Sequence, residues 1–425
     1  MKKVLIISYY WPPAGGSGVQ RWLKFTKYLP KNNWRPIIYT PENPYFEIKD
    51  EKLLSNVPAE AKIWKTAIWE PYALKDRLFG KGKKSQSAGV ISKKKSLKNK
   101  ALNWGRGNIF IPDPKVYWVK PSIKYLLKKI MEEGIEHIIT TGPPHSMHLI
   151  GLGLKRALPQ LKWVADFRDP WSELDLLDDF HLSNFTRRKH QKLEKEVLQT
   201  ADVTLTVSES WTKDLKRLGA ERVELITNGY DAEDFNLTPK TNDKFIIGHY
   251  GLLNHLRNPK NLWRELNVLC DEHKEFNLKL EIHFSGNVDG EVIAEIESFS
   301  NLKGKVRQLG YLSHAEVLQQ YNEASILLLL LFNSKSGVGN YPGKIFEYFA
   351  AKKPILAFGP NDSDTEKLLL KIKGCNYFSY ERKDIKDNIL QLFANPSIYS
   401  QYSDIEGYSR ERLTIDLADL LNTLS

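Results

Sequence analysis

The sequence of 425 residues contains little cysteine and no long apolar run. Its only cysteines, Cys270 and Cys375, lack the spacing of a zinc site or a disulfide framework, which fits a reducing cytoplasm. The longest apolar run, residues 326–332, is much shorter than the roughly 18 residues that would cross a bilayer. Residues 4–7 lead directly into aromatic and proline residues without a small-residue cleavage site, so we expect a core strand there and not a signal peptide.

Acidic residues are absent from one long stretch of an otherwise mixed sequence. The chain has 62 Lys and Arg against 51 Asp and Glu, a net charge of +11. No carboxylate lies between Asp76 and Asp113, whereas residues 77–106 mix many Lys and Arg with apolar and aromatic side chains. Such a mixture favours an anionic membrane surface, at about 1 kcal/mol per well-placed cation. A solvated loop without a partner stays open as an alternative, and we expect no nucleic acid here.

Short β-rich runs alternate with amphipathic helical stretches, which predicts an α/β protein with parallel sheets flanked by helices. The pattern restarts near residue 245, after a polar linker at 231–244. We therefore predict two doubly wound, Rossmann-like domains, residues 1–236 and 243–400, followed by a helical segment at 401–425. Such domains place their ligand sites at the carboxyl ends of the strands, here facing each other across a cleft.

A glycine-rich loop at residues 336–343 is the most informative local feature. It follows the apolar run 326–332 and precedes a helix that begins with Lys344 and carries Glu347 about one turn in. Glycines allow backbone N–H groups to approach a phosphate, and a helix N-terminus adds partial positive charge. Lys344 adds a full charge, and Glu347 is placed to accept hydrogen bonds from a ribose diol. This loop therefore predicts a site for a nucleoside diphosphate.

Five further motifs lie at predicted strand ends: YWPPAGGSGVQR (10–21), TTGPPHSMH (140–148), VADFRDPW (164–171), ITNGYD (226–231) and HYGLLNHLRNPK (249–260). Together with the glycine loop they resemble bacterial family 4 glycosyltransferases, and the likeness runs along nearly the whole chain. The resemblance implies the GT-B fold, with a terminal helix that returns to the first domain. It also implies transfer of a sugar with retention of anomeric configuration.

In the first domain, the resemblance implies that the loop containing Gly16 and Gly18 faces the donor phosphates and the acceptor. It places a histidine close to the reacting sugar; we favour His145 over His148 because His145 is nearer the strand end. Asp169, or Arg168 beside it, would hold an acceptor hydroxyl, and an internal ion pair that fixes the loop is an equally weighted alternative. The motif 226–231 is expected to serve turn geometry.

In the second domain, the resemblance implies that Gly251 ends the first strand and that Arg257 grips the diphosphate, with Lys260 as the alternative. Gly343, Lys344 and Glu347 complete this donor site. The family pattern has two glutamates eight positions apart. Glu347 matches the second of them, and Gly339 stands where the first would be.

Combined with the charge pattern and the few cysteines, the resemblance leads us to expect a cytoplasmic enzyme, peripheral on the inner face of the membrane through residues 77–106. Its donor would be a nucleoside diphosphate sugar, UDP by default, and its acceptor a glycan or lipid-linked precursor of a surface polysaccharide. We expect no metal or other cofactor, and read Asp362 and Asp364 as part of a helix N-cap. Two alternatives stay open: a nucleotide-sugar epimerase, and a non-catalytic nucleotide-sugar-binding or assembly protein that kept the fold.

Overall fold

A computed structural model describes residues 1–46, 48–70, 104–105, 107–235, 242–372, 374–395 and 405–424. Nearly all of the predicted basic segment 77–106, and part of the predicted linker, lie outside these residues. The chain divides into two compact units. Unit 1 comprises Met1–Thr227 and Glu411–Ser425, and unit 2 comprises Asn228–Arg410.

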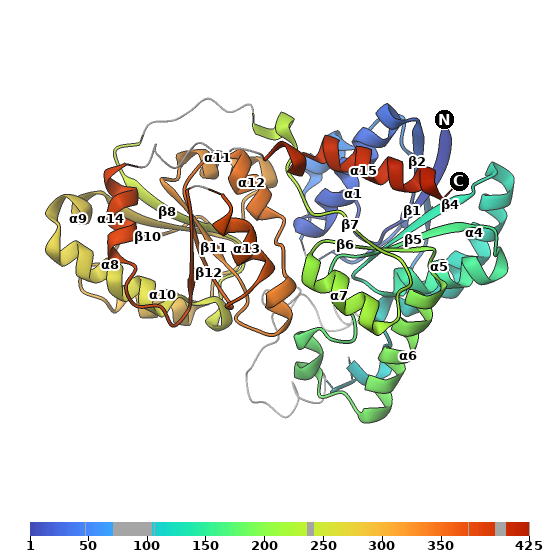
Figure 1. The fold of residues 1–425 in the computed structure, drawn as a ribbon, viewed down its shortest axis with the longest axis horizontal. Helices are drawn as coiled ribbons and strands as arrows, with labels where there is room; N and C mark the ends of the chain where they lie inside the picture. The colour runs from blue at the N-terminus through green and yellow to red at the C-terminus, as the bar shows by residue number, and fades with distance from the viewer. Residues whose placement is uncertain are drawn as a thin grey trace. The chain divides into compact units, whose positions relative to one another are not determined.

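Unit 1 is built on a seven-stranded parallel sheet in the order β3-β2-β1-β4-β5-β6-β7 (Figure 1). The strands are β1 (Lys2–Ile7), β2 (Trp34–Pro41), β3 (Lys62–Thr66), β4 (His137–Gly142), β5 (Lys162–Phe167), β6 (Val203–Thr206) and β7 (Val223–Leu225). The helices are α1 (Ser17–Tyr28), α4 (Val119–Glu133), α5 (Ser146–Ala157), α6 (Asn184–Thr200), α7 (Glu209–Leu218) and α15 (Arg410–Thr423).

Successive side chains of β1 point to opposite faces of this sheet, and helices cover both faces. Leu5 and Ile7 belong to one buried cluster, which includes side chains of α4, α5 and α6. Val4 and Ile6 point the other way, into a second cluster with side chains of α1 and α15. A strand buried on both faces reads as a continuous apolar run, as this one does.

Unit 2 is built on a six-stranded parallel sheet in the order β10-β9-β8-β11-β12-β13. The strands are β8 (Phe245–Tyr250), β9 (Leu280–Ser285), β10 (Val306–Gln308), β11 (Ile326–Leu330), β12 (Ile355–Gly359) and β13 (Cys375–Ser379). The helices are α8 (Lys260–Glu272), α9 (Lys274–Lys279), α10 (Gly290–Glu297), α11 (His314–Glu323), α12 (Lys344–Ala350), α13 (Asp364–Leu370) and α14 (Lys386–Ala394).

The predicted fold class is confirmed, because both sheets are parallel and doubly wound. The terminal helix α15 belongs to unit 1 from Glu411 onward and buries Leu413, Leu417 and Leu421 there, as the sequence predicts. Among the described residues, no helix is both long and apolar enough to cross a membrane.

Each sheet has one point where the strand order reverses, and ligands of doubly wound folds bind outside the strand ends at this point. In unit 1 it lies between β1 and β4, which are followed by the motifs containing Gly16 and His145. In unit 2 it lies between β8 and β11, which are followed by Gly251 and by the glycine loop. The predicted site residues of each unit therefore gather at its reversal point.

Candidate functional site

The Lys344 side chain lies at the end of β8, where Gly251 leaves space for it and a backbone carbonyl oxygen accepts a hydrogen bond from it. Its ammonium group donates a hydrogen bond to the backbone oxygen of Tyr250, with Nζ and O 2.8 Å apart. A Cβ atom on Gly251 would overlap this Nζ, and Gly251 has φ of +154°, which also disfavours a side chain. The absence of a side chain at Gly251 therefore creates the space that Lys344 occupies.

Arg257 lies beyond Gly251, at the end of a short 3₁₀ turn (His255–Arg257). Its guanidinium carbon is 3.6 Å from the centre of the Phe332 ring, which follows β11. Its Nε atom is buried and has no hydrogen-bond partner within the described part of the chain. Burial lowers the pKa of Arg257 to about 10, so the side chain stays charged at neutral pH.

The two cations act on each other electrostatically. Burial, together with the neighbouring charge of Arg257, lowers the pKa of Lys344 to about 7, although Glu347 partly opposes this shift. A lysine with this pKa gains a proton readily when an anion arrives. Arg257 and Lys344 thus provide a partly desolvated positive site at the reversal point of unit 2, and an anionic group is the ligand that this arrangement stabilises best.

Glu347 lies in the first turns of α12 and is fixed by two side chains of α11. Its Oε1 is 3.0 Å from His314 Nε2, and its Oε2 accepts a hydrogen bond from the Tyr321 hydroxyl at 3.1 Å. Burial alone would raise the pKa of Glu347, but His314 and Tyr321 bring it below its usual value. The carboxylate is therefore ionised and oriented, and each oxygen keeps a further lone pair for a ligand.

The other residues predicted for unit 2 lie in different settings. Gly339 is buried in a 3₁₀ turn (Ser336–Gly339), and Gly343 caps α12 with open space where a Cβ would be. Lys260, the predicted alternative to Arg257, is exposed, with its Nζ 3.7 Å from Glu295 Oε1. The Asp362–Asp364 stretch forms a helix cap as predicted, since the Ser363 side chain accepts a hydrogen bond from the backbone N–H of Glu366.

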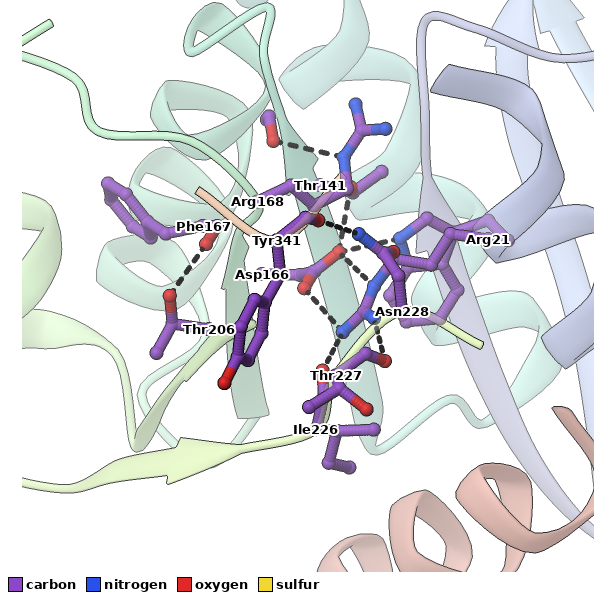
Figure 2. Close-up of polar contacts among 12 residues, drawn as sticks. Arg21, Thr141, Asp166, Phe167, Arg168, Thr206, Ile226, Thr227, Asn228 and Tyr341 are labelled. Atoms are coloured by element: carbon purple, nitrogen blue, oxygen red, sulfur yellow. Dashed lines mark hydrogen bonds and ion pairs between the residues drawn. The ribbon is translucent and has the colours of Figure 1, made fainter. Parts of the chain in front are cut away.

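In unit 1, Asp166 is the centre of a buried ion pair (Figure 2). Its Oδ1 is 3.1 Å from Arg21 Nη2, and it also accepts hydrogen bonds from Trp22 and Thr141. Arg21 donates further to the backbone oxygens of Ile226 and Thr227, so it ties α1 to β5 and to the turn after β7. This pair is fully buried, which makes it a structural anchor.

Arg168 and Asp169 follow this anchor and differ from each other. Arg168 donates hydrogen bonds to the backbone oxygens of Gly18, Gly142 and Pro143, so it joins the loops after β1 and β4. The Asp169 carboxylate has no hydrogen-bond partner in the described part of the chain, and burial raises its pKa. Of the two, Asp169 is the group that remains available for a ligand.

His145 and His148 lie together at the end of β4. His145 stacks on Trp171, with ring centres 5.0 Å apart, and both of its ring nitrogens are buried without a partner among the described residues. Burial holds the pKa of His145 well below its usual value, so the ring is neutral. His148 Nδ1 instead lies 2.8 Å from Thr140 Oγ1, and burial lowers its pKa to about 3.

Glycines shape the surroundings of these histidines. A Cβ at Gly142 would lie 2.6 Å from His148 Nε2 and 2.9 Å from His145 Nδ1, so only glycine lets both rings approach β4. Gly16 has φ of +88° and precedes α1, whereas Gly18 lies inside the first turn. Arg168 thus links Gly18 to the loop that precedes His145, and Asp169 is the next residue along the chain.

Sequence reasoning missed several partners of the site residues: His314, Tyr321, Phe332, Trp171 and His190. The His190 ring accepts a hydrogen bond from the Trp171 indole at 3.0 Å, which holds the ring on which His145 stacks. Of these, His314, Tyr321 and His190 lie outside the quoted motifs, so no local spacing identifies them, whereas Trp171 ends the motif 164–171 and Phe332 ends the apolar run 326–332. A cap signal does precede His314, because Ser313 and Glu316 form a capping box.

Comparison with family models and with curated proteins gives no match. Solved structures do match over the whole chain. Sucrose-phosphate synthase from Thermosynechococcus elongatus is 12% identical, with a TM-score of 0.64 over 100% of this chain and 99% of that one. A mutant of S. aureus TarM in complex with fondaparinux, α-GlcNAc-glycerol and UDP is 13% identical, with a TM-score of 0.62 over 100% of both chains.

An epimerase-like structure matches as well. A putative UDP-N-acetylglucosamine 2-epimerase from Listeria monocytogenes is 10% identical, with a TM-score of 0.59 over 100% of this chain and 96% of that one. At these identities the comparisons show the fold alone, which is GT-B.

Proposed function

We propose that this protein is a retaining glycosyltransferase of family 4 type. It would move a sugar from a nucleoside diphosphate sugar to a glycan or lipid-linked acceptor in cell-surface polysaccharide synthesis. The observation that supports this most is the pair of cations in unit 2. Arg257 and Lys344 lie at the reversal point beside the oriented Glu347 carboxylate. The Arg257 Nε is buried without a partner among the described residues, and the pKa of Lys344 is about 7.

In the proposed reaction, the bond between the anomeric carbon and the diphosphate breaks while the acceptor oxygen attacks from the same face. Negative charge then develops on the leaving diphosphate. Arg257 and protonated Lys344 would stabilise this charge, and the preformed site would need little rearrangement to do so. Glu347 would accept hydrogen bonds from the ribose diol, held in place by His314 and Tyr321.

The residues of unit 1 would serve the acceptor. The neutral His145 ring would offer a ring nitrogen to a sugar hydroxyl. Asp169, whose carboxylate is unpartnered in the described part of the chain, would orient a second hydroxyl. The proton lost by the acceptor would pass to the leaving diphosphate. A metal ion is not required in this scheme, because the two cations supply the charge.

UDP is the proposed nucleotide. The S. aureus TarM structure contains UDP, and so does an S. aureus MnaA structure that matches this chain with a TM-score of 0.54.

We further propose a cytoplasmic location, with residues 77–106 holding the protein on an anionic membrane surface. Deletion of residues 83–100 is expected to weaken binding to anionic vesicles and to leave donor hydrolysis unchanged.

An epimerase is the second candidate, favoured by the match to a putative UDP-N-acetylglucosamine 2-epimerase. The two functions differ in their products. A transferase releases free nucleoside diphosphate only as sugar appears on an acceptor or in water, whereas an epimerase interconverts two intact nucleotide sugars.

The test is to incubate the protein with UDP-, GDP- and ADP-sugars, with and without lipid-linked glycan acceptors, and to analyse the products by NMR. Transfer with the donor's anomeric configuration, abolished in Lys344→Met, is the expected result. A new nucleotide sugar at equilibrium would instead establish an epimerase. Nucleotide binding without any product under all conditions would establish a non-catalytic binding protein.

A further inference from the structure

Helix α6 has two chemically opposite faces. Thr186, His190, Glu194 and Val197 are buried against the rest of unit 1. The outward face carries Phe185 and, at helical spacing, four exposed cations: Arg188, Lys189, Lys192 and Lys195. These four side chains follow one side of the helix over about 10 Å. Figure 1 shows α6 at the margin of its unit.

The outward cations are not neutralised by any residue that the structure describes. None of the four forms an ion pair with any residue that the structure describes. The carboxylates nearby already have partners of their own: Asp178 pairs with Arg187 at 2.8 Å, and Glu196 pairs with Arg156 at 3.2 Å. The exposed Asp179 lies in the turn before the helix. Within the described ranges, the outward face from Arg188 to Lys195 is therefore a strip of positive charge without paired carboxylates.

Exposed apolar side chains adjoin the start of this strip. Phe185 is 75% exposed, and Ile109 and Trp104 are 63% and 50% exposed. The segment containing Trp104 and Ile109 is fixed beside α6, because Asn108 accepts a hydrogen bond from the backbone N–H of Ser183 and donates one to the oxygen of Trp104. Large apolar groups that stay exposed beside a charged surface are typical of a binding face.

We infer that the outward face of α6, with Phe185, Trp104 and Ile109, docks onto an anionic lipid bilayer. Lipid headgroups would neutralise the four cations, while the three apolar side chains would enter the boundary between headgroups and acyl chains. An aliphatic side chain such as Ile109 gains from acyl chains but has nothing to stack on in a nucleic acid. The inference rests on the proposed peripheral location and deepens it, because it adds the face of α6 and Ile109, which lie outside residues 77–106, and joins them to Trp104 at the end of that segment.

The test measures partition of the full-length protein onto vesicles of phosphatidylcholine, with and without phosphatidylglycerol, by co-sedimentation. The variants are Lys189→Gln combined with Lys192→Gln, and separately Phe185→Ser. Each cation near an anionic surface changes partition about fivefold, so the double variant should bind phosphatidylglycerol vesicles about 25-fold more weakly. Phe185→Ser should weaken binding at all salt concentrations, because its contribution is apolar.

The matched control is Lys274→Gln combined with Lys303→Gln, which removes the same charge from exposed positions of unit 2 and should bind like wild type. Equal partition of the α6 variants, the control and wild type would overturn the inference. Binding of an oligonucleotide duplex through Lys189 and Lys192, without vesicle binding, would overturn it in favour of nucleic acid. Nucleotide binding measured on the same preparations reports separately on the proposed transferase function.

Discussion

At the scale of single residues, the account depends on Lys344. Its ammonium group donates a hydrogen bond to one carbonyl oxygen and lies near a second cation, Arg257. Burial and this neighbouring charge lower the pKa of Lys344 to about 7. An incoming diphosphate favours the charged form and raises the pKa again. Ligand binding and protonation of Lys344 are therefore coupled.

This coupling predicts proton uptake on binding of a nucleoside diphosphate. With a pKa of about 7 in the free protein, Lys344 is mostly neutral at pH 8 and charged in the complex, so nearly one proton should be taken up. Near pH 6 the lysine is already charged and contributes no uptake. Affinity should accordingly fall as pH rises above about 7. Calorimetry in buffers of different ionisation enthalpy measures the uptake.

Lys344→Met serves as the control for this measurement. The variant should bind more weakly and should take up no proton at pH 8. Wild-type binding that is independent of pH between 7 and 9, with no proton uptake, would show that Lys344 does not contact the ligand's charge.

Two glycines near Lys344 give a matched pair of substitutions. Gly251→Ala places a Cβ on the lysine ammonium at a positive φ, so it should destabilise unit 2 by about 1–3 kcal/mol and abolish tight nucleotide binding. Gly343→Ala meets no atom within 4 Å and has φ of −53°, so it should leave stability unchanged or slightly raised. Urea unfolding and nucleotide titration measure both effects.

The outcome for Gly343→Ala also reports on the ligand. If the variant is stable but binds nucleotide weakly, the open space beside Gly343 belongs to the ligand. A Gly251→Ala protein with wild-type stability and affinity would refute the packing argument for Lys344.

At the scale of elements, the sequence predicts the central strands well because they are buried on both faces. The core strand expected at residues 4–7 lies within β1, and the helix expected to begin with Lys344 is α12. The strands β3 and β13 were missed: both lie at the ends of their sheets, and every residue of β13 is only half-buried, so neither shows a continuous apolar run. Helix α10 was also missed, although the sequence does carry its signals: Asp289 caps it, and its buried residues have helical spacing.

The candidate site was predictable only in part, for a related reason. Glycine, lysine and arginine positions follow strand ends and so leave a local pattern, as at Gly251 and Lys344. The partners that orient them come from other elements: His314 reaches Glu347 from α11, and Phe332 reaches Arg257 from the end of β11. Such contacts are set by the packing of the fold, which a single sequence does not display.

The terminal helix α15 offers a prediction at this scale. Leu417 is fully buried among side chains of unit 1, so Leu417→Ala should lower the free energy of unfolding of that unit by about 2–5 kcal/mol. Asp419→Ala, at an exposed position two residues later, should change it by less than about 0.5 kcal/mol. Denaturant unfolding measures both. Equal stability of the two variants would mean that α15 does not complete the core of unit 1.

At the scale of the whole molecule, two units with similar topology carry different chemistry at their reversal points. Unit 2 presents two cations and an oriented carboxylate, which suits a charged nucleotide. Unit 1 presents neutral imidazoles and the Asp169 carboxylate, which has no hydrogen-bond partner among the described residues, and these groups suit hydroxyl ligands. This division of charge supports the proposal that the chain joins a donor to an acceptor.

The most direct test of the central claim is thermal stabilisation of the whole protein by UDP, GDP, ADP and CMP. Wild type is compared with Glu347→Ala and with Glu281→Ala, which removes a similar Glu–His pair elsewhere in unit 2. One nucleoside diphosphate at 100 times its dissociation constant should stabilise wild type and Glu281→Ala by about 2.7 kcal/mol. Glu347→Ala should bind about 1–3 kcal/mol more weakly. No stabilisation by any nucleotide, or equal stabilisation of all three proteins, would contradict the account.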